Sequence, residues 1–267
     1  MNTSFADMAL GAALAAGQAI LDIYASADFG VETKANQSPL TKADRAAHHV
    51  IHRALTSTNL PILSEEGRNI PYSERQGWNT FWLVDPLDGT KEFIKRNGEF
   101  TVNIALIEQG VPVFGMVFAP VLDRLYCGAH GIGAFRLDTA SSFRDASWER
   151  VRQAASPLPL PPAPRPHTIV GSRSHPSPEF ADFVAAAQAR YGQIDVRSIG
   201  SSLKICLVAE GSADVYPRLG PTMEWDTAAG HAVAVHAGCS VTRADTDQAL
   251  RYNKENLLNP FFIVERR

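Results

Sequence analysis

Cysteine is scarce in this sequence, and no two cysteines form a paired motif. The 267 residues include three cysteines, Cys127, Cys206 and Cys239, which are widely spaced and make no C-x-x-C pattern. An odd number of such cysteines argues against a disulfide framework and favours buried thiols in a reducing compartment. We therefore expect a cytoplasmic protein.

Basic residues are not in surplus either. Lys and Arg together number 25 and Asp and Glu number 28, so the net charge is −3. General nucleic-acid-binding proteins normally carry a basic surplus or a basic stripe, so we expect no nucleic-acid partner. A small phosphorylated ligand remains compatible with this charge, because it needs only a local basic pocket.

The sequence offers no clear membrane anchor. The apolar run from Met8 to Ala16 is too short to span a bilayer, and Asp7 precedes it where a signal peptide would carry a basic segment. We predict a helix over Ser4 to Ser26 instead, with Ser4-x-x-Asp7 as a capping box. These features predict a protein without a transmembrane segment, and they leave open a peripheral position on the cytoplasmic face of the inner membrane.

Signatures of other enzyme classes are also missing. The sequence contains no Walker A loop and no G-x-G-x-x-G, so a nucleoside triphosphatase or a dehydrogenase has no support. It contains neither a G-x-S-x-G elbow nor a cysteine-phosphatase signature, so a nucleophilic Ser or Cys has none either. His48 and His52 have the i, i+4 spacing of a zinc-binding helix. Without the Glu of H-E-x-x-H or a third ligand nearby, we expect them on a partly exposed helix surface.

The most informative stretch is an apolar run that ends in two carboxylates. Phe81 to Val84 predict a buried strand, which is followed by Asp85-Pro86-Leu87-Asp88-Gly89. The proline turn lets Asp85 and Asp88 face one small volume, which suits a hard cation such as Mg²⁺. A plain surface turn explains the same five residues, since Asp, Pro and Gly all favour turns. Glu65-Glu66, which follows another apolar run, shifts the balance toward a metal site.

Three motifs occur together in the sequence. They are Ser64-Glu65-Glu66, Asp85-Pro86-Leu87-Asp88-Gly89-Thr90 and Trp225-Asp226-Thr227-Ala228-Ala229-Gly230. They resemble the signatures of the inositol monophosphatase superfamily, whose members are magnesium-dependent, lithium-sensitive phosphatases. The continuation from Lys91 to Phe100 is similar to the 3'(2'),5'-bisphosphate nucleotidase branch of that superfamily, the bacterial CysQ type.

The resemblance implies a set of metal ligands. Glu65 and Asp85 would hold one Mg²⁺, and Asp85, Asp88 and Asp226 would hold a second. The carbonyl of Leu87 would be a further ligand, in a site with two or three Mg²⁺. Such cations activate a water and stabilise the leaving oxygen of a phosphate ester. The residues alone explain Asp226 equally well as a helix cap, because it begins a predicted helix.

By the same resemblance, Asp44 and Thr90 would position the attacking water. Thr90 would contact the water and hydrogen-bond to Asp44, which orients the hydroxyl. The residues alone offer another explanation, since Thr41-Lys42-Ala43-Asp44 has the form of a capping box at the start of a helix. The local sequence does not separate the two roles.

A candidate site for a second phosphate lies in Gly200-Ser201-Ser202-Leu203-Lys204. It combines backbone N–H groups, hydroxyls and a cation at a predicted helix start. Arg218 can add a bidentate phosphate contact, and Arg173 is a weaker candidate. The alternative for Lys204 is an ordinary solvated lysine. The predicted substrate-binding residues are Glu65, Leu87, Gly89, Thr90, Lys91, Ser201, Lys204, Arg218 and Asp226.

Patterning predicts two halves. Residues 1–155 carry two helices followed by a largely antiparallel sheet, whose first strands we expect at 60–64 and 80–85. Residues 156–166 are rich in proline, so they are neither helix nor central strand. Helices and strands alternate in the second half, residues 156–267. The resemblance implies α+β and α/β layers in an αβαβα sandwich, with the metal site between the halves.

The resemblance also implies an activity. This is hydrolysis of the 3'-phosphate of adenosine 3',5'-bisphosphate to AMP and phosphate, with the phosphosulfate analogue as a second substrate, in sulfur metabolism and nucleotide recycling. The attack would be made by metal-activated water without a phosphoenzyme. Two alternatives stay open: an inositol or sugar monophosphatase of the same superfamily, and a non-catalytic sensor of the bisphosphate nucleotide. A homodimer is compatible with the sequence, which does not decide the oligomeric state.

Overall fold

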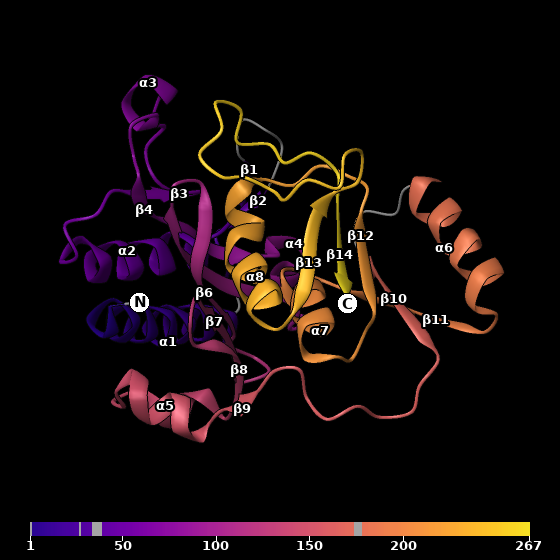
Figure 1. The fold of residues 1–267 in the computed structure, drawn as a ribbon. Coiled ribbons are helices and arrows are strands. Elements are labelled where there is room, and N and C mark those ends of the chain that lie inside the picture. Colours follow the sequence, from indigo (N-terminus) through magenta and orange to yellow (C-terminus); the bar gives the residue numbers. More distant parts are fainter. Residues whose placement is uncertain (1, 27, 34–38, 174–177) are drawn as a thin grey trace.

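The computed structural model describes residues 2–26, 28–33, 39–173 and 178–267. Two larger sheets and the helices around them make up most of this part of the chain (Figure 1). The first sheet has seven strands in the order β3-β4-β5-β6-β7-β8-β9, with β3 and β4 parallel and the other neighbours antiparallel. These strands are β3 (Ile62–Ser64), β4 (Thr80–Asp88), β5 (Thr101–Glu108), β6 (Val111–Ala119), β7 (Arg124–Ala129), β8 (Gly133–Asp138) and β9 (Ser156–Pro157).

The second sheet has five strands in the order β11-β10-β12-β14-β13. β10 pairs in parallel with β11 and β12, whereas β14 is antiparallel to β12 and β13. The strands are β10 (His167–Ser172), β11 (Ile194–Ile199), β12 (Val215–Arg218), β13 (Cys239–Arg243) and β14 (Phe262–Arg266). A small separate pair is formed by β1 (Glu32–Thr33) and β2 (Pro39–Leu40).

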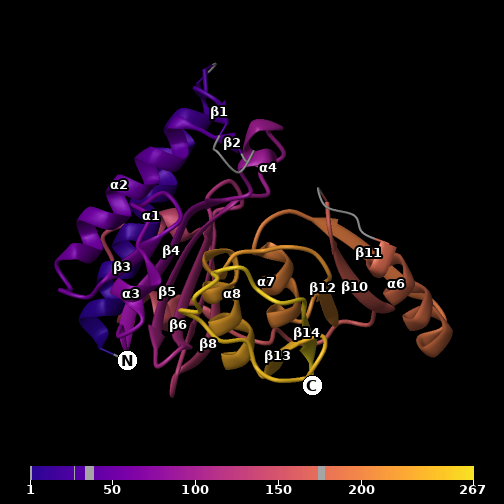
Figure 2. The ribbon, with the colours of Figure 1, turned by 90° about the horizontal axis from the view of Figure 1, so that it is seen from above.

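Helices form three layers around the two sheets (Figure 2). The outer face of the seven-stranded sheet is covered by α1 (Thr3–Tyr24), α2 (Lys42–Thr56) and α5 (Trp148–Ala154). Between the sheets lie α7 (Leu203–Glu210) and α8 (Glu224–His236), and α6 (Pro178–Tyr191) covers the far face of the five-stranded sheet. The connections contain α3 (Tyr72–Arg75), α4 (Thr90–Ile94) and a 3₁₀ helix, Ala140–Phe143. This arrangement confirms the predicted αβαβα sandwich.

The alternation along β5 separates the two main cores. Val102, Ile104 and Leu106 are buried on the side of α1 and α2. Ala105 and Ile107 are buried on the opposite side, with side chains of α7 and α8. Because a strand residue points to the face opposite its neighbour, one strand supplies apolar surface to both cores. Burying each large aliphatic side chain contributes about 1.5–3 kcal/mol.

Two glycines let α8 lie directly on the seven-stranded sheet. A Cβ at Gly115 of β6 would be 2.2 Å from the carbonyl oxygen of Ala229, and one at Gly128 of β7 would be 2.6 Å from that of Ala232. Both distances are shorter than any real contact of a Cβ atom. The close approach brings the helix that carries Asp226 against the sheet that carries Asp85.

The N-terminal cap of the first helix differs from the predicted capping box. Asn2 caps α1 through a hydrogen bond from Ser4 N–H to Asn2 Oδ1 at 3.0 Å. The predicted capping box is therefore wrong: Asp7 instead accepts a hydrogen bond from the N–H of Trp148 at 2.6 Å, which ties α1 to α5. By length and composition α1 passes as a membrane span, but half of the relevant window is buried inside the protein. Ala6, Ala13 and Ile20 are fully buried, as expected for a core helix.

The two predicted halves share their layers. β9 lies within the second half, yet it pairs with β8 at the edge of the first sheet. α8 also belongs to the second half and packs on the first sheet. The packing runs continuously across residue 155. The division there therefore stays a prediction about the order of elements along the chain. The proline-rich segment after β9 forms no helix and no central strand, as expected.

Candidate active site

A β-bulge in β4 brings the two aspartates of the predicted turn to one face of the sheet. Asp85 lies opposite Asn103 of β5, and Asp88 lies opposite Thr101. Three residue steps on β4 therefore match two steps on β5. The extra residue in β4 shifts by one the alternation of its side chains between the two faces of the sheet. Both aspartates consequently lie on the face that meets α7 and α8. The predicted strand end at residue 85 is wrong, because β4 continues to Asp88.

Three carboxylates from separate elements meet at this point. Glu65, Asp85 and Asp226 each place an oxygen within 4.8 Å of the others. Glu65 follows β3, where its N–H donates to the carbonyl of Val84 at 3.1 Å, and Asp226 is in the first turn of α8. Burial, together with repulsion by neighbouring carboxylates, raises the pKa of Asp85 and Asp226 well above the usual range. A cation relieves such repulsion, and carboxylate oxygens are the donors that hard divalent cations prefer.

Asp88 lies beside this trio and is oriented by two side chains of the protein. Its Oδ2 accepts hydrogen bonds from Ser202 Oγ at 2.8 Å and from Asn103 Nδ2 at 3.4 Å. Burial raises the pKa of Asp88, while the nearby Lys204 ammonium and these hydrogen bonds act in the opposite direction. The Leu87 N–H donates to Asp85 Oδ1 at 3.0 Å, so the bulge also fixes Asp85.

Asp226 acts as the cap that the sequence allowed. Its Oδ2 accepts a hydrogen bond from the N–H of Met223 at 2.9 Å, just before α8 begins. The same carboxylate still reaches the cluster with Glu65 and Asp85. Asp226 therefore caps α8 and also belongs to the carboxylate cluster. The two roles that the sequence left open as alternatives are compatible.

Asp44 likewise accepts hydrogen bonds at a helix start and at the cleft wall. Its Oδ2 accepts hydrogen bonds from Thr41 N–H at 2.7 Å and from Thr41 Oγ1 at 2.6 Å, which confirms the capping box of α2. Its Oδ1 accepts a hydrogen bond from Thr90 Oγ1 at 3.1 Å. Thr90 follows Gly89, whose φ of +96° makes the turn from β4 into α4. One buried carboxylate therefore caps a helix and orients a hydroxyl that lines the cleft.

The predicted site residues surround one cleft of about 270 Å³, which is lined from both halves of the chain. Its lining includes Glu65, Asp85, Leu87, Asp88, Gly89, Thr90, Lys91, Ser201, Lys204, Arg218 and Asp226. Asp44 is 1% exposed and lies behind Thr90. The cleft therefore lies where residues from both parts of the chain meet, and its role as the metal site stays a prediction.

This constellation can be compared with known proteins. The chain matches the model of the inositol monophosphatase family over residues 1–263. It belongs to that family. The resemblance drawn from the three motifs is thereby confirmed.

Two curated relatives are 3'(2'),5'-bisphosphate nucleotidases named CysQ. The one from Salmonella typhimurium is 47% identical over 253 residues, which cover 93% of this chain and 94% of the relative. The one from Buchnera aphidicola is 41% identical over 242 residues, which cover 86% of this chain and 80% of the relative.

Solved structures agree with this placement. The crystal structure of CysQ from Bacteroides thetaiotaomicron, a bacterial family member, superposes with a TM-score of 0.93 at 50% identity, covering 100% of this chain and 98% of that one. An IMPase from Thermotoga maritima shares the fold, with a TM-score of 0.73 at 21% identity, covering 97% of this chain and 91% of that one.

Phosphatases of the inositol monophosphatase family depend on metal ions, and the acidic cluster fits that requirement. The donors are carboxylates that fold together in spite of their mutual repulsion. Of the described residues that line the cleft, none is a Cys or a His. An all-oxygen donor set favours hard cations over zinc or copper.

Two buried cations line the same cleft as the acids. Lys204 is 7% exposed and Arg218 is 8% exposed. Burial lowers the pKa of Lys204 to about 8, although Asp88 acts in the opposite direction. Lys204 Nζ lies 5.7 Å from the ring centroid of Tyr216, and Arg218 Nε has no hydrogen-bond partner among the described residues. Lys204 is therefore not the ordinary solvated lysine that was the alternative.

The predicted anion site around residues 200–204 needs correction in its details. The Gly200 N–H donates to Glu99 Oε2 at 2.8 Å, and Lys204 Nζ donates to the carbonyl of Ser201 at 2.6 Å. These donors are already engaged within the protein. Arg173, a weaker candidate, forms an ion pair with Glu99 at 2.7 Å. A phosphate at this site would therefore depend on the charges of Lys204 and Arg218 more than on the start of α7.

Sequence reasoning missed several residues that hold the site together. Ser202 was assigned to an anion site, whereas its Oγ contacts Asp88 and the carbonyl of Asp226 at 2.6 Å. Asn103 Nδ2 donates to the same hydroxyl at 2.9 Å. The signal for Asn103 in the sequence is a polar residue between the apolar residues Val102 and Ile104. Glu92 is 5% exposed and lines the cleft, but the sequence marks it only as part of the family continuation.

The histidines and cysteines lie where the sequence suggested. His48 is half-buried and its Nδ1 lies 3.0 Å from Ser64 Oγ, while His52 is exposed. All three cysteines are free and buried. Burial raises the pKa of Cys127 and Cys206 well above the usual range, so these thiols are poor nucleophiles.

The acidic cluster predicts a pH-dependent response of stability to metal. The folded-state pKa values of Asp85, Asp88 and Asp226 are raised, so the metal-free folded protein holds protons that the unfolded chain releases above about pH 4. The free energy of unfolding of the metal-free protein should therefore fall as pH rises from about 4 through the raised pKa values of the folded state. Because cations compete with these protons, the rise in Tm caused by Mg²⁺ should be larger at pH 8 than at pH 5.5.

Thermal unfolding with EDTA or with Mg²⁺ at both pH values measures this difference. At saturating Mg²⁺ the increase at pH 8 should be about 5–10 °C. An increase that is equal at the two pH values would contradict a cation that binds the raised carboxylates.

Proposed function

We propose that this chain is a Mg²⁺-dependent 3'(2'),5'-bisphosphate nucleotidase that removes the 3'-phosphate of adenosine 3',5'-bisphosphate. The observation that carries the proposal is the pair of buried cations, Lys204 and Arg218, in the same cleft as the acidic cluster. A substrate with two phosphates needs a cationic site besides the metal site, whereas an inositol monophosphate does not. The two nucleotidases at 47% and 41% identity support the same substrate class.

The predicted ligands and the residues that orient them have separate roles in this reaction. Glu65, Asp85, Asp88, Asp226 and the carbonyl of Leu87 would hold the cations, which supply Lewis acidity at the ester phosphate when bound. Thr90 would hydrogen-bond the attacking water, since its Oγ1 is fixed by Asp44 at 3.1 Å and lies at the cleft wall. Ser202 and Asn103 keep Asp88 oriented.

The substrate side of the cleft has its own set of residues. Lys204 and Arg218 would balance the charge of the second phosphate, in a setting where burial strengthens electrostatic attraction. Gly89, Lys91 and Ser201 complete the predicted contacts with substrate around the same cleft. We further propose a cytoplasmic enzyme, which is consistent with the three free thiols.

Phosphate release from adenosine 3',5'-bisphosphate and from inositol 1-phosphate, measured side by side in Mg²⁺, tests the proposal. We expect kcat/KM for the nucleotide to exceed that for the inositol ester by at least about a hundredfold, since a buried charged contact contributes about 1.5–3 kcal/mol and two are present. A preference for the inositol ester would leave the metal chemistry in place and overturn the substrate. Binding of the nucleotide without phosphate release would favour the sensor.

Lys204→Met should affect KM for substrates with two phosphates more than KM for substrates with one. The substitution removes the ammonium and keeps the volume, so we expect KM for the bisphosphate to rise by about 10–100-fold with little change for a monophosphate. In the wild-type enzyme, KM for the bisphosphate should also rise above about pH 8, where Lys204 loses its proton.

Lys95→Met is the matched control, because Lys95 is exposed and does not line the cleft. Steady-state kinetics with both substrates give the comparison. An equal increase of KM for both substrates in Lys204→Met would assign the ammonium to the phosphate that reacts.

A further inference from the structure

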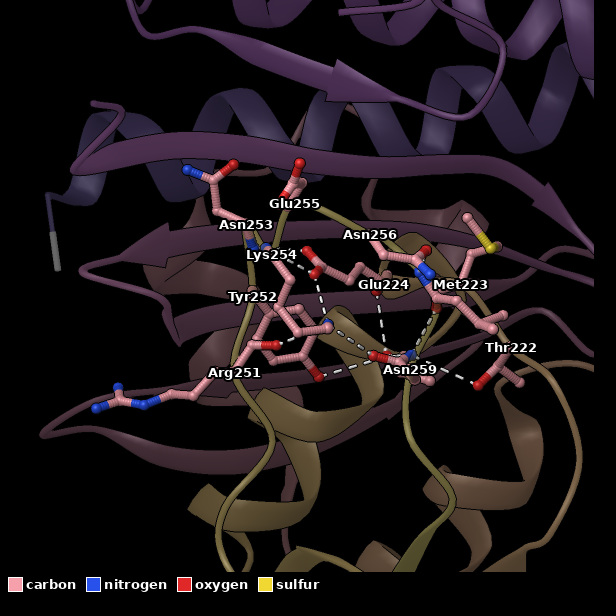
Figure 3. Close-up of polar contacts among 12 residues, drawn as sticks. Thr222, Met223, Glu224, Arg251, Tyr252, Asn253, Lys254, Glu255, Asn256 and Asn259 are labelled. Carbon is pink, nitrogen blue, oxygen red and sulfur yellow. Dashed lines mark hydrogen bonds and ion pairs between the residues drawn. The ribbon is translucent and has the colours of Figure 1, made fainter. Parts of the chain in front are cut away.

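A loop that is distant in sequence from the acidic cluster holds the start of α8. Glu224, the first residue of α8, is fully buried. Its carboxylate accepts hydrogen bonds from Asn253 N–H at 2.6 Å, from Lys254 N–H at 3.0 Å and from Lys254 Nζ at 2.6 Å (Figure 3). The loop around residues 253–254 therefore binds α8 at Glu224, two residues before Asp226.

Asn259 connects the same loop to Asp226 through one backbone unit. Its Nδ2 donates to the carbonyl of Met223 at 2.8 Å and to Thr227 Oγ1 at 3.0 Å, and its N–H donates to the carbonyl of Thr222 at 2.8 Å (Figure 3). The N–H of Met223 in turn donates to Asp226 Oδ2 at 2.9 Å. Asn259 thus fixes the backbone of Met223, and the N–H of Met223 in turn binds the Asp226 carboxylate.

The loop is itself anchored to the first half of the chain. Arg75 of α3 is 2% exposed. Its guanidinium donates to the carbonyls of Lys254 at 2.7 Å and Glu255 at 2.8 Å, and to Asn253 Oδ1 at 2.9 Å. The support for α8 therefore extends to the part of the chain that carries Asp85.

Asp226 needs such support. Its carboxylate has an oxygen within 4.8 Å of carboxylate oxygens of Glu65 and Asp85. A carboxylate on a helix terminus that could shift would move away from like charges and give up its position beside Glu65 and Asp85. Hydrogen bonds from outside the cluster resist that movement.

We propose that Asn259 and the Glu224–Lys254 pair are positioning residues, which hold the Asp226 carboxylate at the metal-binding cluster through the backbone of residues 222–224. The inference rests on the proposed metal role of Asp226. None of these positioning groups belongs to the acidic cluster itself. Supporting groups of this kind affect metal affinity by about 10–100-fold.

Metal binding to the purified protein tests the proposal without use of activity. Asn259→Ala should weaken Mn²⁺ or Mg²⁺ binding in calorimetry by about tenfold. At saturating metal, KM for the bisphosphate should stay near that of the wild type, because Asn259 does not line the substrate cleft. Lys254→Met, which leaves the backbone bonds of Glu224 in place, should weaken metal binding in the same way. Asn256→Ala is the control, since the side chain of this exposed neighbour accepts a hydrogen bond from the N–H of Leu258 and makes none of the bonds to residues 222–224 described above.

The outcomes separate the positioning role from a structural role. A lower Tm with unchanged metal affinity in both Asn259→Ala and Lys254→Met would overturn the proposal. Asp226→Asn, titrated in parallel, reports on the metal role of Asp226 itself. Unchanged metal affinity in Asp226→Asn would overturn that role, whereas weak binding in Asp226→Asn together with wild-type binding in Asn259→Ala and Lys254→Met would overturn only the positioning role.

Discussion

Replacement of Asp85 by Asn should lower the rate of phosphate release by at least about a thousandfold. Asp85 is 2% exposed, lies in the cluster with Glu65 and Asp226, and would contact both cations in the proposed metal site. An amide cannot supply the same negative charge, so one substitution would weaken both metal positions. Metal ions contribute several kcal/mol to phosphoryl transfer, and a thousandfold loss corresponds to about 4 kcal/mol.

The same substitution should stabilise the protein when metal is absent. Asp85 is repelled by Glu65, Asp88 and Asp226, and its burial without a cation is unfavourable. Asp85→Asn removes one of these charges, so Tm in EDTA should rise while the increase produced by Mg²⁺ should shrink. This opposite response of activity and stability distinguishes a metal ligand from a residue needed for folding.

Asp145→Asn, at an exposed position outside the cleft, is the control for both measurements. Phosphate release at increasing Mg²⁺ and thermal unfolding in EDTA provide the data. Wild-type turnover by Asp85→Asn, or a lower Tm in EDTA, would contradict the assignment.

Replacement of Thr90 by Val should reduce kcat by at least about a hundredfold, with little change in metal affinity. The Thr90 hydroxyl is held by Asp44 Oδ1 at 3.1 Å and lines the cleft beside the acids. Valine has nearly the same shape but cannot hydrogen-bond a water, so the variant loses orientation of the attacking group. Positioned groups that act on the proton of a nucleophile contribute about 10²–10⁴-fold.

Thr90→Ser is the matched control for this variant. It restores the hydroxyl next to Asp44, so we expect most of the activity to return. Single-turnover phosphate release gives the rate of the chemical step, and calorimetry with Mg²⁺ gives the metal affinity. A Thr90→Val enzyme that reaches the wild-type kcat would exclude Thr90 from water positioning, and a large loss of metal affinity would assign the hydroxyl to metal binding instead.

Local patterning predicted most of the secondary structure. The strands expected at 60–64 and 80–85 correspond to β3 and to most of β4, and the capping box at Thr41 located the start of α2 to within a residue. The short helices α3, α4 and α5 escaped prediction, because a helix of four to seven residues has little periodicity to detect. The capping box of α1 was misjudged because Asp7 bonds to Trp148, a contact across 141 residues that no local rule reveals.

Seven of the twelve residues predicted for the site belong to the three motifs, and five lie outside them: Asp44, Lys91, Ser201, Lys204 and Arg218. All but Asp44 line the cleft itself. Family resemblance carried this choice for Asp44 and Asp226, because their local sequences are explained equally by helix capping. In the structure both residues do cap a helix while also reaching the site. Capping had been treated as an alternative to a role at the site, but a carboxylate has two oxygens and serves both.

The sequence by itself determined the family, the acidic motifs and the alternation of elements that predicts the layers, because these depend on residue identity at short spacing. Only the tertiary structure decided how the acids meet. The bulge that places Asp85 and Asp88 on one face depends on pairing with β5. The approach of α8 depends on two glycines in β6 and β7, and the bonds that hold α8 come from residues 253–259. These relations join segments far apart in the chain, so they arise only when packing fixes their distances.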